Sequence, residues 1–522
     1  MIDLFTNPDL FTYIDKYTHL QSLCDTCVLL LTFKKYITYN FNNEYSLMYF
    51  NDILFRQRVL NKIFNPYKQL HLDLSYLGND NLPNTVDVSA LGNVHKLDLS
   101  RSDVSDVSAL GNVHTLNLMR CKKITDVSVL GNVHTLYLNC CDNITDVSAL
   151  GNVYKLYLSN CDNITDVSAL GKVHTLDLSY CNLITDVSAL RNVHILDLTD
   201  CNKITDVSAL GNVHKLKLGY CNITDISALG NVYELDLKFC KQIKDVSALG
   251  KVHNLYLNDC NITDVSALGN VYELCLLDCK NITDVSALGN VHTLCLTGCD
   301  KITDVSALGK VHSLNLFRCN LITDVSALGN VHTLNLEDCN KITDVSALGN
   351  VHKLCLHGCY NIKDVSALGN VYELDLSYCK KITDFTPLKN VHTLNLSFCT
   401  ITDVSMLRNI HTLDLSNCKQ IVDVSALGNI HTLDLCGSNI TDVSGLGNVY
   451  ELNLSHCKNL IDVSALGNVY DLNLSHCDNI IDVSALGNVH RLDLVYCDKI
   501  NDVSALKNVH NLYLPYRLYI NK

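Results

Sequence analysis

Aspartate, histidine and cysteine recur at nearly constant spacing along this chain of 522 residues, and each of these types could do chemistry. From Asp87 onward, an Asp returns every 19 or 20 residues in 22 copies of the phrase DVSALGNVHxLxLxxC. Rows of carboxylates could bind calcium, imidazoles could transfer protons, and thiols could bind metal or form disulfides. Each residue type also has a structural role that would explain the same spacing.

The Asp column is interpreted as structural. Its carboxylates would stack about 4.8 Å apart if the copies keep strand spacing. Calcium needs six or more oxygens, and repeats that bind it in rows carry a glycine-rich loop that this phrase lacks. In ITDVSALGN, Asp126 stands where an N-cap accepts backbone N–H groups, and Gly131 stands where a left-handed C-cap is expected. We therefore predict a ladder of N-caps and no metal.

The 26 cysteines are interpreted as reduced, and 19 of them end a copy of the phrase. Secreted disulfide scaffolds are short and begin with a signal sequence, whereas MIDLFTNPDLF has an early acidic residue and no basic segment. We therefore expect a reducing cytoplasm. Cys24 and Cys27 form a lone C-x-x-C with only His19 nearby, which favours a helix core over zinc.

The residue after the Val of each copy is His in 16 copies and Tyr in six, which is typical of a position that needs a flat ring. We expect a stacked column of rings at the strand entrance. Neighbouring imidazoles about 4.8 Å apart should resist joint protonation, so their pKa values should lie below about 6.5. Because the copies are nearly identical, no single catalytic site is distinguished, and we predict no enzyme activity and no cofactor.

The elements that must position these columns follow from the period. About 20 residues leave room for a short strand and two turns, but not for the helix of an ordinary parallel crossover. The return to the next strand must therefore be extended or a single helical turn. The sequence predicts an α/β solenoid of 22 repeats with a degenerate first strand, over residues 67–522.

The segment V-x-x-L-x-L-x-x-C, as in Val113, Leu116, Leu118 and Cys121, resembles the leucine-rich repeat signature L-x-x-L-x-L-x-x-N/C. This resemblance implies a parallel sheet on a concave face, short returns on a convex face, and an inward Cys bonded to loop backbone. It also implies a monomeric scaffold for protein–protein interaction. The layout resembles leucine-rich repeat proteins of giant viruses of amoebae, which would place the protein in a host cytoplasm.

The central residue of Leu-x-Leu differs between copies and points outward from the strand. A variable strip on a constant scaffold is typical of a binding surface, although neutral drift of solvated residues gives the same pattern. Aromatic and Arg side chains are enriched at interfaces. The candidate partner-binding residues are Arg120, Tyr137, Tyr157, Tyr180, Lys217 and Phe317.

Charge and hydropathy exclude other partners. The net charge of -14 includes the 22 repeated Asp residues, without which 32 acidic residues face 40 basic ones. The variable strip has no stripe of Lys and Arg with interleaved aromatics, so we expect no nucleic acid. The apolar run Val28–Leu31 is too short to cross a membrane.

Residues 1–66 lack the repeat phrase, and their density of Tyr, Phe and Leu requires a small core. We expect two helices, a strand near Tyr36–Phe41, a helix from Glu44 to Ile63, and a stop at Asn65 and Pro66. Such a module would cover the open end of the solenoid.

The start of this module resembles an F-box, which implies docking to a Skp-type adaptor and a role as substrate-recruiting adaptor of a cullin ubiquitin ligase. Asn7 replaces the usual Leu, and Leu30 stands where an aromatic is expected. A generic helical cap would have the same apolar spacing, so both interpretations stand. The candidate adaptor-docking residues are Pro8, Leu10, Ile14, Leu20, Leu23 and Cys27.

Overall fold

The computed structural model describes residues 39–62, 70–75, 87–516 and 518. The chain divides into two compact units, Met1–Tyr256 and Leu257–Lys522. Their boundary falls within the repeats, so the predicted boundary between residues 66 and 67 stays a prediction. None of the described helices is both long and apolar enough to cross a membrane.

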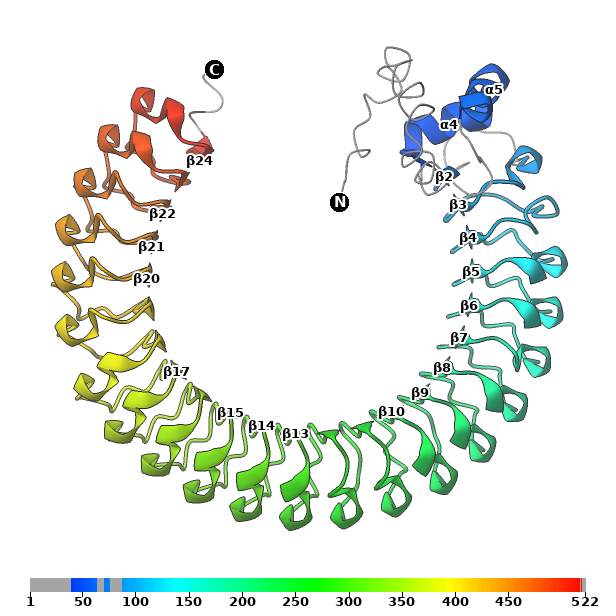
Figure 1. The fold of residues 1–522 in the computed structure, drawn as a ribbon, viewed down its shortest axis with the longest axis horizontal. Helices are drawn as coiled ribbons and strands as arrows, with labels where there is room; N and C mark the ends of the chain where they lie inside the picture. The colour runs from blue at the N-terminus through cyan, green and yellow to red at the C-terminus, as the bar shows by residue number, and fades with distance from the viewer. Residues whose placement is uncertain (1–38, 63–69, 76–86, 517, 519–522) are drawn as a thin grey trace, which may run out of the picture. The chain divides into compact units, whose positions relative to one another are not determined.

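Among its described residues, the first unit has the α-helices α4 (Asn43–Asn51) and α5 (Ile53–Lys62) and a parallel sheet (Figure 1). Its strands are β1 (Tyr39–Asn40), β2 (Leu70–Asp73), β3 (Lys96–Asp98), β4 (Thr115–Asn117), β5 (Thr135–Tyr137), β6 (Lys155–Tyr157), β7 (Thr175–Asp177), β8 (Ile195–Asp197), β9 (Lys215–Lys217), β10 (Glu234–Asp236) and β11 (Asn254–Tyr256).

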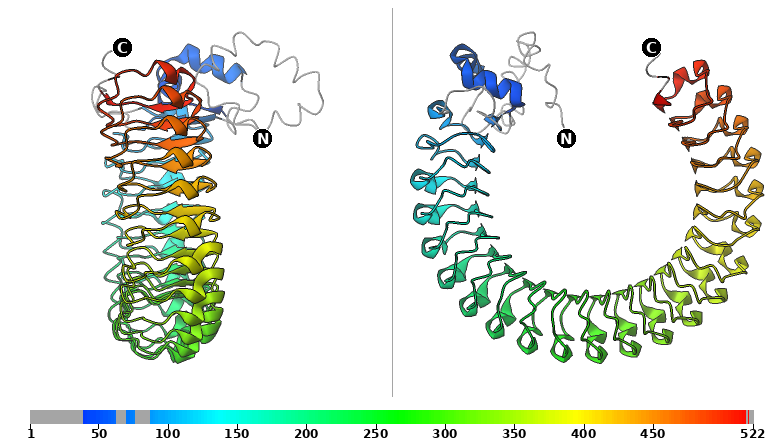
Figure 2. Two further views of the ribbon diagram at one scale, coloured as in Figure 1. Left: turned by 90° about the vertical axis from the view of Figure 1, so that its left-hand side faces the viewer. Right: turned by 180° about the vertical axis from the view of Figure 1, so that it is seen from behind.

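The second unit consists of strands and short turns. Its strands are β12 (Glu273–Cys275), β13 (Thr293–Cys295), β14 (Ser313–Asn315), β15 (Thr333–Asn335), β16 (Lys353–Cys355), β17 (Glu373–Asp375), β18 (Thr393–Asn395), β19 (Thr412–Asp414), β20 (Thr432–Asp434), β21 (Glu451–Asn453), β22 (Asp471–Asn473), β23 (Arg491–Asp493) and β24 (Asn511–Tyr513). In each unit the strands line the inner side and the 3₁₀ turns the outer side (Figures 1 and 2).

The leucines of Leu-x-Leu set the register of the sheet. Leu97 pairs with Leu116 and Leu116 with Leu136 on parallel strands, and the same pairing repeats in the second unit, as for Leu294 and Leu314. Both leucines of each copy point into the core and are almost completely buried, except in the last copy, where Leu512 is half-buried. The expected solenoid with a parallel sheet and short returns is confirmed, because hydrophobic burial drives each copy onto its neighbour.

The return segments are 3₁₀ helices of three or five residues, as in η1 (Ser89–Leu91) and η2 (Ser128–Asn132), except in the copy that begins at Asp106, where they are turns. The repeated Asp accepts a backbone hydrogen bond from the residue two positions on, as Asp126 Oδ1 does from Ser128 N at 2.8 Å. This bond lowers the pKa of the exposed Asp126 carboxyl. Asp126 accepts a backbone N–H as expected, but the expected N-cap position is wrong, because Val127 is the N-cap residue.

The expected left-handed conformation of the repeated Gly is wrong. Gly92 and Gly171 have φ of -61° and -63°, which is right-handed. A Cβ at Gly131 would lie 2.3 Å from the carbonyl oxygen of Ala149 in the next copy. The position therefore favours Gly because neighbouring turns approach closely. Arg191 and Arg408 are among the side chains that occupy it in other copies.

The Cys column joins consecutive copies. Cys141 Sγ donates to the carbonyl of Leu118, in the preceding copy, at 3.2 Å, and burial raises the pKa of this thiol to about 12. Where Ser438 replaces Cys, its hydroxyl donates to the equivalent carbonyl of Leu415 at 3.4 Å. The expectation of a buried, inward side chain bonded to backbone is confirmed. The acceptor is the carbonyl of the residue directly after the strand of the preceding copy.

The N-terminal module is attached to the sheet by β1, which pairs in parallel with β2. A strand near Tyr36–Phe41 was expected and is confirmed over Tyr39–Asn40. The single helix expected from Glu44 to Ile63 is wrong, because the helix is interrupted at Asp52. Asp52 is extended, with φ of -108°, and its carboxylate accepts the N–H groups of Leu54 and Phe55, which starts a second helix.

Candidate protein-binding surface

The central residue of Leu-x-Leu has a structural role in most copies, although its residue type varies. When it is Asp or Asn, its Oδ1 accepts the N–H of the residue two positions on, as in Asp98 to Ser100 at 2.8 Å and Asn335 to Glu337 at 2.8 Å. This bond closes the turn that follows the strand. Exchange between Asp and Asn therefore preserves one hydrogen bond and does not indicate free drift.

Some copies have a residue at this position that lacks the carboxylate or amide acceptor. In the first unit these are Tyr137, Tyr157, Lys217 and Tyr256, and in the second unit they are Cys275, Cys295, Cys355 and Tyr513. These side chains replace an Asp or Asn that would stabilise the turn. Copies without Asp or Asn at the central position are therefore the best candidates for a specific function.

Tyr137 and Tyr157 are register partners on β5 and β6, and their rings stack with centroids 4.6 Å apart and an interplanar angle of 5°. Both side chains are half-buried. Burial, with the neighbouring Tyr137 and Asp177, raises the pKa of the Tyr157 hydroxyl. The structure thus brings two of the candidate residues together as one flat aromatic patch.

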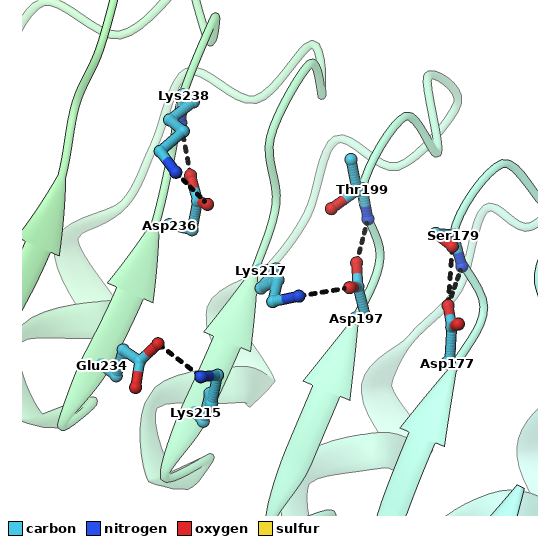
Figure 3. A network of polar contacts seen from close by, with 9 residues as sticks. All are labelled: Asp177, Ser179, Asp197, Thr199, Lys215, Lys217, Glu234, Asp236 and Lys238. Atoms are coloured by element: carbon cyan, nitrogen blue, oxygen red, sulfur yellow. Dashed lines mark hydrogen bonds and ion pairs between the residues drawn. The ribbon is translucent and has the colours of Figure 1, made fainter. Parts of the chain in front are cut away.

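Next to this patch lies a row of charges on β7 to β10 (Figure 3). Lys217 Nζ lies 3.0 Å from Asp197 Oδ2, and Lys215 Nζ lies 2.6 Å from Glu234 Oε1. Lys238 Nζ lies 3.2 Å from Asp236 Oδ2 and also over the Tyr256 ring, 4.8 Å from its centroid. The candidate residue Lys217 is therefore paired with a carboxylate on the same inner face of the sheet.

Asp177 ends this row. Its Oδ1 accepts both the backbone N–H and the hydroxyl of Ser179, the latter at 2.6 Å. Burial raises the pKa of the Asp177 carboxyl, and nearby Asp197 raises it further. Burial opposes the charge of Lys217, but the hydrogen bond and charge of Asp197 outweigh it, so the pKa of Lys217 is raised. Together, Asp177, Asp197, Glu234 and Asp236 face Lys215, Lys217 and Lys238, which leaves the row slightly acidic.

Arg120 and Tyr180 lie in the turn after the strand and not on the strand itself. Their φ angles are 62° and 63°, and their N–H groups donate to Asn139 and Thr199 of the next copy at 2.8 Å. Left-handed backbone costs an ordinary residue roughly 1–2 kcal/mol. The bond to the next copy holds the residue in this conformation. Both side chains are exposed.

Aromatic side chains also stack at this left-handed position in other copies, which sequence reasoning missed. Tyr220 and Phe239 stack at 4.4 Å in the first unit, and Tyr378 and Phe398 stack at 4.3 Å in the second. The signal was present in the sequence as aromatic residues directly before Cys in consecutive copies.

Phe317 lies in the second unit, in the turn after β14. Its N–H donates to Asn315 Oδ1 at 2.9 Å, and the guanidinium of Arg318 lies 4.7 Å from the centre of its ring.

The ring column that the sequence predicts is confirmed in each unit. Ring centroids are 4.5–4.9 Å apart from His95 to His253 and from Tyr272 to His510. Burial and the neighbouring imidazoles lower the pKa of His114 and of His411. Within the described residues, no group of three or more His, Cys, Asp or Glu is arranged to hold a metal ion.

The adaptor-docking residues lie outside the described residues. Pro8, Leu10, Ile14, Leu20, Leu23 and Cys27 all precede Tyr39, as do Cys24 and His19. The F-box interpretation therefore stays a prediction from sequence.

Three stretches of the chain, residues 172–190, 189–211 and 388–407, match the family described as Leucine Rich repeat. No curated protein matches the sequence. Together with the parallel sheet and the short returns, these matches define the fold as a leucine-rich repeat solenoid, a fold that is typically not enzymatic.

Two solved structures from Listeria monocytogenes illustrate the similarity. The functional domain of InlJ, described as including a cysteine ladder, is 24% identical, with a TM-score of 0.40, and the match covers 56% of this chain and 70% of that chain. The internalin InlF is 20% identical, with a TM-score of 0.23, and the match covers 67% of this chain and 84% of that chain.

Proposed function

We propose that this protein is a scaffold for protein–protein interaction, and that the inner strip of its first unit contacts the partner. The observation that carries the proposal is the stacked pair of Tyr137 and Tyr157, in which two adjacent copies have an aromatic side chain in place of the acceptor that closes the turn. This pair lies directly beside Asp177, the first of the charged residues of β7 to β10. Leucine-rich repeat proteins generally bind protein partners.

The chemistry of this strip indicates what its partner presents. The stacked tyrosines offer a flat, partly buried apolar surface with hydroxyl groups at its edge, which suits an aromatic or aliphatic anchor. Asp177 lies next to them in a half-buried position and would gain a charge-assisted hydrogen bond from a Lys or Arg. We therefore infer a partner segment with an apolar side chain close to a basic one.

The experiment uses reversion to the repeat consensus. A Tyr137→Asn, Tyr157→Asn variant restores the acceptors that close the turns, so the solenoid stays folded while the aromatic patch disappears. The tagged full-length protein and this variant are used to enrich proteins from host-cell extract, and each enriched protein is then purified and its Kd measured. We expect at least tenfold weaker binding by the variant.

Val129→Ala is the matched control, because it also restores the consensus but lies in an outer turn of the same unit. Equal binding of every purified partner by all three proteins would contradict a role for the strip. Loss of binding in Val129→Ala as well would mean that the outer surface or general stability is responsible.

We also propose, from the sequence of residues 1–66, that the N-terminal module docks a Skp-type adaptor and makes the protein a substrate-recruiting subunit of a cullin ubiquitin ligase in a host cytoplasm. The proposal rests on the F-box-like spacing of Pro8, Leu20 and Leu23. In it the repeats recruit substrate as a monomer and do no transfer chemistry.

Co-purification from host cells tests this second proposal. The full-length protein should recover Skp-type and cullin subunits, and a Leu20→Asp, Leu23→Asp variant should lose them while keeping the partners of the inner strip. Absence of both subunits from both preparations would leave the alternative, in which the module only caps the solenoid.

A further inference from the structure

Three cysteines of the second unit occupy the central position of Leu-x-Leu and therefore lie on the inner face rather than in the core. They are Cys275 on β12, Cys295 on β13 and Cys355 on β16, and all three are half-buried. The core column differs from them, since Cys279 and Cys299 of the same copies are completely buried. The three inner-face cysteines share one backbone environment and differ mainly in their neighbours.

Cys275 and Cys295 are register partners on adjacent parallel strands. Neighbouring strands are about 4.8 Å apart, which lies within the range of roughly 4.4–6.8 Å that Cα atoms of disulfide-bonded cysteines span. Parallel side chains must still lean together, because the Cβ atoms of a disulfide are only about 3.8 Å apart. A bond formed here would be strained and therefore easily reduced.

The two thiols already interact. A hydrogen bond from Cys275 to the sulfur of Cys295 lowers the pKa of the Cys295 thiol to about 6, against the opposing effect of burial. Thr297 supports the thiolate, with Oγ1 3.4 Å from Cys295 Sγ. Cys355 is the internal comparison, because its register partners are Asn335 and Asp375, and burial raises its pKa to about 12.

We propose that Cys275 and Cys295 form a reversible redox site, in which disulfide exchange with a small-molecule disulfide such as oxidised glutathione joins the two sulfurs. The site lies on the inner face of the second unit, and its ligand class is a disulfide or another soft electrophile. It is independent of the core cysteine column, whose sulfurs are buried and hydrogen-bonded to backbone carbonyls, as for Cys299 and Leu276.

The reaction balances in two exchange steps. The Cys295 thiolate attacks one sulfur of oxidised glutathione, forms a mixed disulfide, and releases one glutathione thiolate, which can take the proton of the Cys275 thiol. The Cys275 thiolate then attacks the Cys295 sulfur and releases the second glutathione as a thiolate, which takes up the proton that Cys295 lost when it ionised. The protein loses two electrons and two hydrogens, and oxidised glutathione becomes two molecules of reduced glutathione.

The thiolate populations set the expected selectivity. At pH 7 a thiol of pKa about 6 is mostly ionised, whereas one of pKa about 12 is ionised at about one part in 10⁵, although its thiolate is intrinsically more nucleophilic. Combining both effects, we expect Cys295 to react on the order of 100-fold faster than Cys355.

The experiment treats the full-length folded protein with oxidised and reduced glutathione in fixed ratios at pH 7, followed by acid quenching and peptide mass spectrometry. Trypsin cleaves after Lys280, which separates the two cysteines into different peptides. Fragment spectra must distinguish Cys275 from Cys260 and Cys279, which lie in the same peptide, and Cys295 from Cys299. We expect a Cys275–Cys295 cross-link that reduced glutathione reverses.

Two variants keep the test decisive. In Cys275→Ser the reaction should stop at a glutathione adduct on Cys295, and in Cys355→Ser the cross-link should form as in the natural protein. Absence of the cross-link at every ratio, or modification of Cys355 as fast as Cys295, would overturn the proposal. Circular dichroism before and after treatment verifies that the cysteines reacted in the folded state.

Discussion

Comparison of the copies shows which interaction each position of the repeat makes. In most copies, one position accepts a hydrogen bond through Asp or Asn, one donates through Cys or Ser to the preceding copy, and one holds an aromatic ring or imidazole in a column. At several copies the chemistry of the position is preserved although the residue type changes. Ser438 in place of Cys keeps the donor, and Asn335 in place of Asp keeps the acceptor.

The central position provides a stability prediction. Cys355 lies between Asn335 and Asp375, so Cys355→Asn should restore an oxygen acceptor for the N–H of His357. A net intramolecular hydrogen bond is worth roughly 0.5–1.5 kcal/mol, and we expect stabilisation near the lower end because sulfur is already a weak acceptor. Urea unfolding followed by circular dichroism measures it, and a destabilised variant would contradict the assigned role.

The core Cys provides a second prediction. Cys141→Val removes the donor to Leu118 and adds one methyl group at a fully buried position, so it should destabilise the protein by at least about 1 kcal/mol. Ser438→Cys should be nearly neutral, because either residue donates to the equivalent carbonyl. Equal unfolding midpoints for Cys141→Val and the natural protein would show that the thiol hydrogen bond is unimportant.

At the scale of elements, the strands and the core were predictable, whereas three local features were not. The two leucines, the buried Cys and the ring column follow from spacing within one copy. The interruption at Asp52 depends on a side-chain cap inside an otherwise helical stretch. The left-handed residue, as at Arg120, and the close approach at Gly131 are imposed by contacts with the next copy, which the sequence of one copy does not contain.

The Gly of the outer turn distinguishes two explanations. A Cβ at Gly309 would lie 2.2 Å from the carbonyl oxygen of Ala327, so Gly309→Ala should cost roughly 1–3 kcal/mol. If a left-handed conformation were the reason, Gly309→Asn would be tolerated better than Gly309→Ala. Close approach predicts that Asn is no better, and unfolding midpoints of the two variants decide the matter.

The ring columns make stability depend on pH. Burial and neighbouring imidazoles hold the folded pKa of His114, His174 and His411 below 6.5. Folding therefore favours the neutral imidazoles. Their contribution to the free energy of unfolding is complete above pH about 6.5 and is lost as the pH falls toward the pKa values of the folded state. Melting temperatures should be lower at pH 5.5 than at pH 7.5.

This measurement is best made in a Cys275→Ser, Cys295→Ser background, because the Cys295 thiol titrates in the same range. The repeated Asp residues have lowered pKa values and change protonation only below 3.8, outside this window. A variant with His→Gln substitutions along one column that kept the full pH dependence would rule out the imidazoles as its cause.

At the scale of the whole molecule, nearest-neighbour contacts dominate, so the N-terminal end is the part that needs protection. β1 pairs with the edge of β2, and apolar side chains on both sides of the junction, such as Val59 of α5 and Leu70 of β2, are 1% exposed. The sequence predicted such a cover. It could not decide whether the cover also docks an adaptor, since apolar helix faces serve both purposes equally.

Removal of residues 1–66 should expose the edge of β2 and cause aggregation. Size-exclusion chromatography should show large species for this truncated protein and one discrete species for the full chain. A Leu20→Asp, Leu23→Asp variant that remains discrete would separate covering of the edge from adaptor docking, and a discrete truncated protein would contradict the covering role.

The uniform Leu-to-Leu register has a consequence for how the chain finds its structure. Because each copy offers its neighbours nearly the same edge, a strand that paired one copy too far along would lose little contact energy and would expel only a loop of about 20 residues. Order along the stack is then specified by chain connectivity more than by side-chain recognition. The same degeneracy makes insertion or deletion of whole copies a small change, so that the length of the array can vary over generations while its architecture persists.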